Sequence, residues 1–293
     1  MVQPDVTGLW ESFNGPHDLV RTSDGTTLFL RRWGSGGDAK ATVLILHGIT
    51  AYSGPYGPLI AEQLALAGFD VVGMDLRGHG LSEGRRGDYP SAERLRKDLS
   101  ETVEFVRAKS RKLVVLGHSL GVLSAIVAVK ERPESIDGVI LLSAAKKINT
   151  EAFAKPSAGA AFRNLLGATF LPGRPLIQYR RRGMGGLDDP LFNFRYSARF
   201  YSVLYGVGAV PLSRMLREGL LDSPNLTIGQ KLRIPLLVGV GDHDEIFAVE
   251  SARQFYEGID ADDKTFFVIP GARHAVFPKD AWGPVLSWLA EKF

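Results

Sequence analysis

One pentapeptide has the composition of a nucleophilic site: Gly117-His118-Ser119-Leu120-Gly121. It lies where an apolar, β-branched segment changes into a segment of helical character, which predicts a strand, a sharp turn and a helix, with Ser119 at the tip of the turn. Side chains at positions 117 and 121 would collide with the flanking strand and helix. At a helix N-terminus, free N–H groups can stabilise a developing oxyanion. The alternative interpretation is a serine that caps a helix in a glycine-rich loop.

A serine hydroxyl needs a base to become nucleophilic near neutral pH, and a histidine oriented by a carboxylate meets that need. Of the six histidines, His274 alone follows the last predicted strand at the same edge as the serine. Asp242 and Asp244 compete as the acid. We favour Asp244 because Glu245, Ile246 and Phe247 after it complete the acid, polar, apolar pattern of a loop that turns into a helix. The order serine, aspartate, histidine is the one expected beside such an elbow.

A second oxyanion donor is expected from the loop after the first buried strand. The sequence there is His47-Gly48-Ile49-Thr50. We predict that the backbone N–H of Ile49 pairs with that of Leu120 to form the oxyanion hole. His47 is expected to brace this loop and to take no part in the chemistry.

Alternating strands and helices are predicted to carry these residues. Residues 18–22 and 26–33 alternate around a Ser-Asp-Gly turn, which predicts a hairpin at the antiparallel edge of a sheet. Apolar runs predict buried strands at 42–46, 69–74, 113–116, 138–142, 234–240 and 265–269. Helices are predicted at 56–66, 91–109, 122–129, 249–257 and 281–292. This order is typical of an α/β fold with a mostly parallel sheet, whose ligands bind at the carboxyl ends of the strands.

The alternation stops in the middle of the chain. We expect residues 1–145 and 223–293 to form the core domain, and residues 146–222 to form a helical cap (lid) insert without a buried strand but with a short helix near 194–205. The insert has twelve Lys or Arg against five Asp or Glu, a net charge of +7 that leaves −4 for the remainder. The run Tyr179-Arg180-Arg181-Arg182 is either an anion or membrane-surface patch or a solvated loop.

Composition excludes several classes of function. The 293 residues contain no cysteine, which excludes disulfides, thiolate nucleophiles and cysteine-ligated metals. A net charge of +3 is too small to argue for a nucleic-acid partner. The first residues lack a signal-peptide pattern, and no apolar run is long enough to span a bilayer, so we expect a cytoplasmic protein. His243 lacks further ligands at metal-binding spacing.

Five motifs together resemble the α/β-hydrolase superfamily. They are His47-Gly48, the segment from Asp75 to Gly84, the Ser119 pentapeptide, Gly241-x-x-Asp244 and Gly271-Ala272-x-His274. The Ser-Glu-Gly at 82–84 is similar to the monoacylglycerol lipase and lysophospholipase-like branch, also described as serine aminopeptidase-like. The resemblance covers residues 25–145 and 225–293. It implies a carboxylic ester hydrolase that needs no cofactor and acts through an acyl-Ser119 intermediate.

The insert leaves the substrate open. Its apolar segments, 162–171 and 191–207, favour an ester with an apolar acyl chain, such as a monoacylglycerol or lysophospholipid, although they could equally pack the cap against the core. The same triad would serve a small-ester esterase, a lactonase, a C–C hydrolase, a peptidase or an acyltransferase. A hydrolase-fold ligand receptor with little turnover is a further alternative. The basic cap could also make transient contact with a membrane surface.

Overall fold

The strands of the core lie in one sheet in the order β1-β2-β4-β3-β5-β6-β9-β10. The computed structural model describes residues 6–181, 189–208, 218, 219, 221–278 and 280–293. The strands are β1 (His17–Arg21), β2 (Thr27–Trp33), β3 (Thr42–Leu46), β4 (Asp70–Met74), β5 (Leu113–His118), β6 (Gly138–Leu142), β9 (Leu236–Gly241) and β10 (Lys264–Ile269). β1 and β2 pair antiparallel, as do β2 and β4, and the remaining pairs are parallel. The predicted parallel sheet with an antiparallel hairpin at one edge is confirmed.

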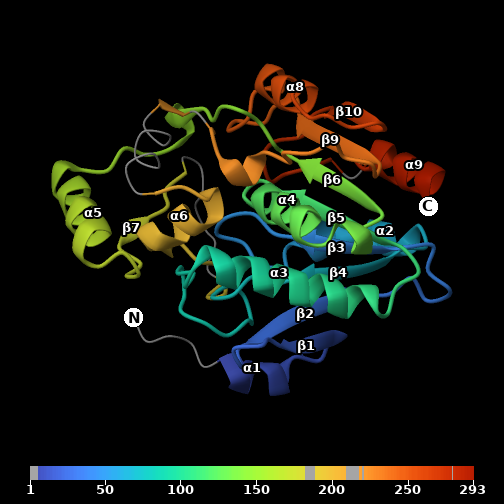
Figure 1. Ribbon diagram of the computed structural model, residues 1–293, viewed down its shortest axis with the longest axis horizontal. Coiled ribbons are helices and arrows are strands. Elements are labelled where there is room, and N and C mark those ends of the chain that lie inside the picture. Colours follow the sequence, from blue (N-terminus) through green and yellow to red (C-terminus); the bar gives the residue numbers. More distant parts are fainter. Residues whose placement is uncertain (1–5, 182–188, 209–217, 220, 279) are drawn as a thin grey trace.

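Helices cover both faces of this sheet (Figure 1). α2 (Glu62–Leu66) and α9 (Gly283–Lys292) pack on one face, and α3 (Ala92–Arg107), α4 (Gly121–Glu131) and α8 (Val249–Glu257) pack on the other. Because both faces are covered, every residue of β3 is buried, which explains its unbroken apolar sequence. The α/β-hydrolase fold follows from this arrangement, with the loops of the predicted site at one edge.

The predicted helix boundaries hold within a few residues, with two differences. A π-helical turn (Gly57–Ala61) precedes α2, so the predicted helix at 56–66 is only partly α-helical. Apolar periodicity cannot separate i+4 from i+5 hydrogen bonding within a single turn. A short helix α1 (Val6–Ser12), which the sequence analysis does not predict, lies near the N-terminus.

The segment 146–222 leaves the sheet and lies over the edge where the parallel strands end (Figure 1). Its described elements are α5 (Ala158–Phe170), β7 (Ile177–Gln178), β8 (Arg195–Tyr196) and α6 (Ala198–Tyr205). Two short strands that the sequence analysis does not predict, β7 and β8, pair antiparallel, with Tyr196 fully buried. Because each strand also has a residue that is not buried, the described part of the segment has no fully buried strand, as expected. Strands of two residues are too short for alternation to reveal. The helix expected at 194–205 begins only after Ser197, whose hydroxyl accepts a hydrogen bond from Phe200 N–H at 2.9 Å.

Candidate active site

Ser119 lies at a strained turn between β5 and α4. Its φ of 56° is in the left-handed region, which costs an L-residue other than glycine about 1 kcal/mol. A Cβ on Gly117 would lie 2.5 Å from Gly121 O, and a Cβ on Gly121 would overlap Leu46 O. The predicted collision with the flanking helix is confirmed for Gly117, whereas the side chain excluded at Gly121 would collide with the end of β3, the neighbouring strand.

Three predicted residues from three loops meet at this turn. Ser119 Oγ lies 2.9 Å from His274 Nε2, and His274 Nδ1 lies 3.0 and 3.1 Å from the two carboxylate oxygens of Asp244. One Asp244 oxygen also accepts hydrogen bonds from Ile246 N–H at 2.9 Å and Phe247 N–H at 3.0 Å. Burial alone would raise the pKa of Asp244, but the hydrogen bond from His274 and the two backbone N–H groups outweigh burial and lower the pKa. The carboxylate is thus charged and can hold the imidazole with Nδ1 protonated.

The two candidate acids lie in different surroundings. The Asp242 side chain is 36% exposed and accepts a hydrogen bond from the neighbouring His243 Nδ1 at 2.7 Å. The Asp244 side chain is fully buried against His274. The structure therefore brings Asp244 to the histidine and leaves Asp242 at the surface. Within the described residues, no group of three His, Cys, Asp or Glu side chains could hold a metal ion.

Ser143 contacts the acid and was not singled out from the sequence. Its hydroxyl donates a hydrogen bond to the Asp244 carboxylate at 2.8 Å, and its φ of 53° is again left-handed. It directly follows β6, the strand next to β5, so its place at the carboxyl edge of the sheet was the only sequence feature that could have indicated it. Backbone strain at such a residue is typical of functional sites.

The two predicted oxyanion donors belong to the loops on either side of Ser119. Neither Ile49 N–H nor Leu120 N–H has a hydrogen-bond partner among the described residues. The loop of Ile49 is held from the insert: Thr50 N–H donates to the hydroxyl of Tyr196 at 2.8 Å, and that hydroxyl donates to the Asn193 carbonyl at 2.9 Å. Segment 146–222 therefore braces the loop that carries one of the expected donors.

His118 links the three loops and does not face Ser119. Gly48 N–H donates to the Tyr56 hydroxyl at 3.0 Å, and that hydroxyl lies 2.8 Å from His118 Nδ1. His118 Nε2 lies 2.9 Å from the His274 carbonyl, which can only accept, so Nε2 carries the proton and Nδ1 accepts from Tyr56. Burial and the neighbouring His274 lower the pKa of His118 to about 3, so the ring stays neutral.

Burial also makes His47 and His79 neutral. Desolvation lowers the pKa of His47 and lowers that of His79 well below its usual value. His47 Nδ1–H donates to the Gly48 carbonyl at 2.9 Å, and Nε2 accepts from Leu76 N–H at 3.1 Å. These two hydrogen bonds hold the Ile49 loop against the loop after β4. This contact is the bracing of the loop that we expected of His47.

Acid is expected to destabilise the protein through these histidines. Between pH 6.5 and about 3, unfolded His118 binds a proton that the folded ring does not. The contribution of a neutral buried histidine to the free energy of unfolding is therefore fully present above pH 6.5. It falls as the pH falls, by up to about 1.4 kcal/mol per pH unit for each buried neutral histidine. Urea unfolding of the wild type and His118→Gln between pH 7.5 and 4.5 measures this, and the variant should show a slope smaller by about one proton. Equal slopes would contradict a neutral buried His118.

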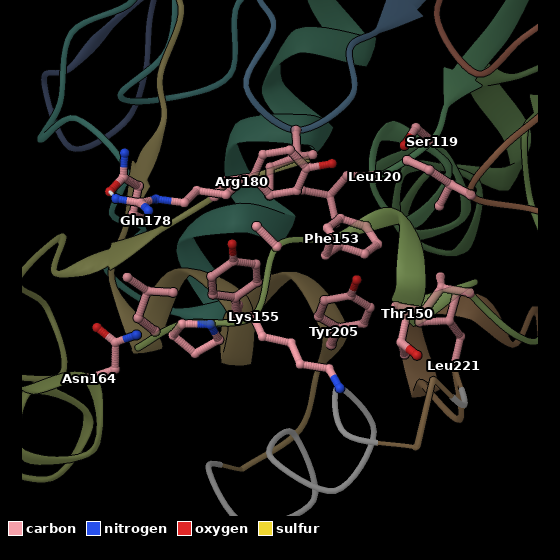
Figure 2. Close-up of a pocket in the computed structure, with 18 of the residues that line it drawn as sticks. Ser119, Leu120, Thr150, Phe153, Lys155, Asn164, Gln178, Arg180, Tyr205 and Leu221 are labelled. Atoms are coloured by element: carbon pink, nitrogen blue, oxygen red, sulfur yellow. Dashed lines mark hydrogen bonds between the residues drawn. The ribbon is translucent and has the colours of Figure 1, made fainter. Parts of the chain in front are cut away.

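A cavity of about 980 Å³ opens beside Ser119 under segment 146–222. Much of its wall is apolar or aromatic, and these lining residues include Ile49, Leu120, Leu123, Phe153, Tyr201, Tyr205, Leu221, Leu226, Ile246 and Phe247. Figure 2 shows Gln178 and Arg180 across the cavity from Ser119. The cavity can therefore hold an elongated, largely apolar molecule with one end at the hydroxyl.

The described part of the basic run, residues 179–181, lies beside the cavity and the Glu245 loop. Tyr179 and Arg180 line the cavity. Arg181 is mostly buried and lies 3.7 Å from Glu245, whose carboxylate accepts the His274 N–H at 3.2 Å. Arg182 lies outside the described residues. Of residues 179–181, Arg180 is exposed at the cavity and Arg181 is turned towards Glu245, so the two arginines have different surroundings.

Known proteins share both the sequence pattern and the fold. The profile of the family described as Serine aminopeptidase, S33 matches residues 37–280. The monoglyceride lipase of Rattus norvegicus is 30% identical over 269 residues, which cover 89% of this chain and 83% of the rat protein. The uncharacterized protein YnbC of Escherichia coli strain K12 is 28% identical over 269 residues, but this chain spans less than half of its length, 43%.

A solved structure agrees with these relatives. The monoacylglycerol lipase of Paleococcus ferrophilus matches with a TM-score of 0.62 and 28% identity, over 91% of this chain and 99% of that one. The family match spans strands β3 to β10, the Ser119 turn and the loops of Asp244 and His274. The chain belongs to the serine aminopeptidase S33 family of α/β hydrolases.

Proposed function

We propose that this protein is a serine hydrolase that cleaves carboxylic esters, with Ser119, His274 and Asp244 as a catalytic triad. The observation that carries the proposal is the contact of Ser119 Oγ with His274 Nε2 at 2.9 Å, on an imidazole whose Nδ1 meets the Asp244 carboxylate. This is the arrangement in which a neutral imidazole can accept the hydroxyl proton.

The reaction then follows in two balanced steps. Ser119 Oγ attacks the ester carbonyl while His274 Nε2 takes its proton, and the carbonyl oxygen becomes an oxyanion beside Ile49 N–H and Leu120 N–H. His274 returns the proton to the alcohol oxygen, the C–O bond breaks and acyl-Ser119 remains. Water attacks the acyl group through the same base, and the carboxylic acid leaves.

We infer that the substrate is a lipid-like ester with an apolar acyl chain. The apolar and aromatic lining of the cavity beside Ser119 supports this class, as do the monoglyceride and monoacylglycerol lipases among the relatives. In this proposal, residues 146–222 act as a cap over the core formed by residues 1–145 and 223–293. The cap selects the substrate, because it supplies most of the wall that lies away from the hydroxyl.

The test is steady-state hydrolysis of p-nitrophenyl esters from acetate to palmitate and of a monoacylglycerol. We expect turnover with an optimum at medium or long chains, since the cavity holds an extended acyl group. An optimum at acetate would favour a small-ester esterase. A single acylation without steady-state hydrolysis would favour the ligand-receptor alternative, and no reaction with any ester or with a fluorophosphonate label would contradict the proposal.

We also propose that the cap contacts an anionic lipid surface. α5 extends away from the sheet (Figure 1) and exposes Phe162, Leu165 and Phe170, whose side chains are 63%, 64% and 73% exposed. Exposed apolar groups of this size on one helix are typical of a docking surface. The insert around them carries a net charge of +7, which is complementary to anionic lipid head groups.

Vesicle binding checks this contact. The wild type is expected to cosediment with phosphatidylglycerol-containing vesicles, and Phe162→Ser with Phe170→Ser should weaken binding at least about tenfold, because two large apolar side chains no longer enter the interface. Leu66→Ser is the matched control, since Leu66 is 89% exposed at the opposite edge of the sheet. Equal loss in the control, or binding unchanged in the double variant, would contradict the contact.

No helix in the described residues has the length and apolar character needed to cross a membrane.

A further inference from the structure

We propose that the cavity selects ester substrates that carry an anionic group, which is attracted by the positive charge that Lys155, Arg163 and Arg180 give to the cavity wall. The inference rests on the proposed function, because it assumes that the ester carbonyl lies at Ser119. To the proposed ester group at Ser119, the inference adds an anionic group elsewhere in the same substrate.

The cavity wall is positively charged. Among the described residues that line the cavity are three cations, Lys155, Arg163 and Arg180, and no Asp or Glu. No ion pair joins these cations to an acidic residue within the described part of the chain. Two other arginines of the same segment do have acidic partners, since Arg181 lies 3.7 Å from Glu245 and Arg199 pairs with Asp88. The cavity wall thus carries positive charge that no carboxylate of the described residues neutralises.

The orientation of α5 adds to this charge. The helix begins after Ser157, whose hydroxyl accepts a hydrogen bond from Ala160 N–H at 3.3 Å, and its first turn has no acidic residue. Ser157, Gly159 and Ala160 line the cavity, so the positive end of the helix dipole lies at its wall. Arg163 lies one turn further along the same face as Ala160, which places its charge beside that helix end.

Arg180 is held at the far side of the cavity. Its Nη2 donates a hydrogen bond to Gln178 Oε1 at 2.7 Å, and both side chains line the wall. Figure 2 shows this pair on the side of the view away from Ser119, with Leu120 and Phe153 between them, and Lys155 apart from the pair. The Ser119 side of the cavity therefore suits the ester, and the wall away from it carries the positive charge that suits an anion.

The anion can be part of either half of the ester. A phosphate in the alcohol would make the substrate an acylglycerol phosphate, whereas a carboxylate at the far end of the acyl chain would make it a half-ester of a dicarboxylic acid. Both present oxygen atoms that accept charge-assisted hydrogen bonds from guanidinium and ammonium groups. The shared chemistry is an amphiphilic ester with one anionic end.

Two matched substrate pairs separate these sources. The first pair is 1-lauroylglycerol and 1-lauroylglycerol 3-phosphate, and the second is p-nitrophenyl octanoate and the mono-p-nitrophenyl ester of octanedioic acid. In at least one pair, we expect kcat/KM for the anionic member to exceed that for the neutral member about tenfold at low ionic strength. The pair that shows the preference identifies the half of the substrate that carries the anion.

The variant Arg163→Gln with Arg180→Gln is expected to lower this ratio about tenfold, because the charge-assisted hydrogen bonds are lost. Arg174→Gln is the matched control: it removes one exposed arginine from the same segment, and Arg174 does not line the cavity. A ratio near one in both pairs for the wild type, or an equal fall in the control, would overturn the inference.

A binding measurement tests the anion site separately from the proposed ester hydrolysis. If no ester is hydrolysed, the proposed function fails, and titration calorimetry with 1-lauroylglycerol 3-phosphate and octanedioic acid monoester still tests the cations. Binding to the wild type that weakens about tenfold in the double variant and not in Arg174→Gln would support the anion site. Binding of equal strength in all three proteins, or no binding of either compound, would overturn it.

Discussion

Ser119→Ala is expected to lower kcat for ester hydrolysis by about 10⁴- to 10⁶-fold. The variant removes the oxygen that lies 2.9 Å from His274 Nε2, so no acyl-enzyme can form. The apolar cavity and the backbone N–H groups of Ile49 and Leu120 remain, which leaves only weak acceleration by binding and by the oxyanion hole. The measurement is steady-state hydrolysis of p-nitrophenyl octanoate, together with labelling by a fluorophosphonate and mass spectrometry of the protein.

The fold should survive this change. Alanine keeps a Cβ at the φ of 56°, so the backbone strain stays and the free energy of unfolding should change by less than about 1 kcal/mol. Ser119→Gly is a useful companion, because glycine adopts this φ without the Cβ penalty, and it should be equally inactive and at least as stable as Ser119→Ala. Activity above about 1% of wild type in either variant, or fluorophosphonate label on another residue, would reject Ser119 as the nucleophile.

Asp244→Asn should produce the second largest loss, about 10⁴-fold in kcat, while Asp242→Asn should change kcat less than about twofold. The Asp244 carboxylate accepts the His274 Nδ1–H and the Ser143 hydroxyl, whereas an asparagine NH2 group there would favour the wrong histidine tautomer. Among the described histidines, the only one whose ring is hydrogen-bonded to Asp242 is the exposed His243.

The two asparagine variants are matched, since each removes one charge from the same loop. Kinetics from pH 5 to 9 separate the roles, and the lowered pKa of Asp244 means that its carboxylate is already ionised throughout this range. Circular dichroism should show folded protein in both cases. A larger loss in Asp242→Asn than in Asp244→Asn would assign the acid to Asp242, and small losses in both would argue against an aspartate in the mechanism.

The sheet and the Ser119 turn could be predicted from the sequence because both depend on local chemistry. Strands covered on both faces must be apolar throughout, as in 42–46 and 138–142, and an exposed hairpin must alternate. The turn needs small residues within two positions of Ser119, and a Cβ at Gly117 would clash with Gly121 in the same motif. The clash at Gly121 is with Leu46 at the end of the neighbouring strand, so only the folded sheet reveals it. The insert was predicted less well, since two-residue strands leave no periodic pattern.

The sequence by itself determined the fold family, the nucleophile turn and the short set of residues from which a triad could be built. Only the tertiary structure decided which of those residues meet. It brings Asp244, and not Asp242, to His274, adds Ser143 as a partner of the acid, and gathers Lys155, Arg163 and Arg180 around one cavity. The physical reason is that these contacts join loops far apart in the chain, and their geometry depends on how several strands end at one edge and on where the insert folds over it.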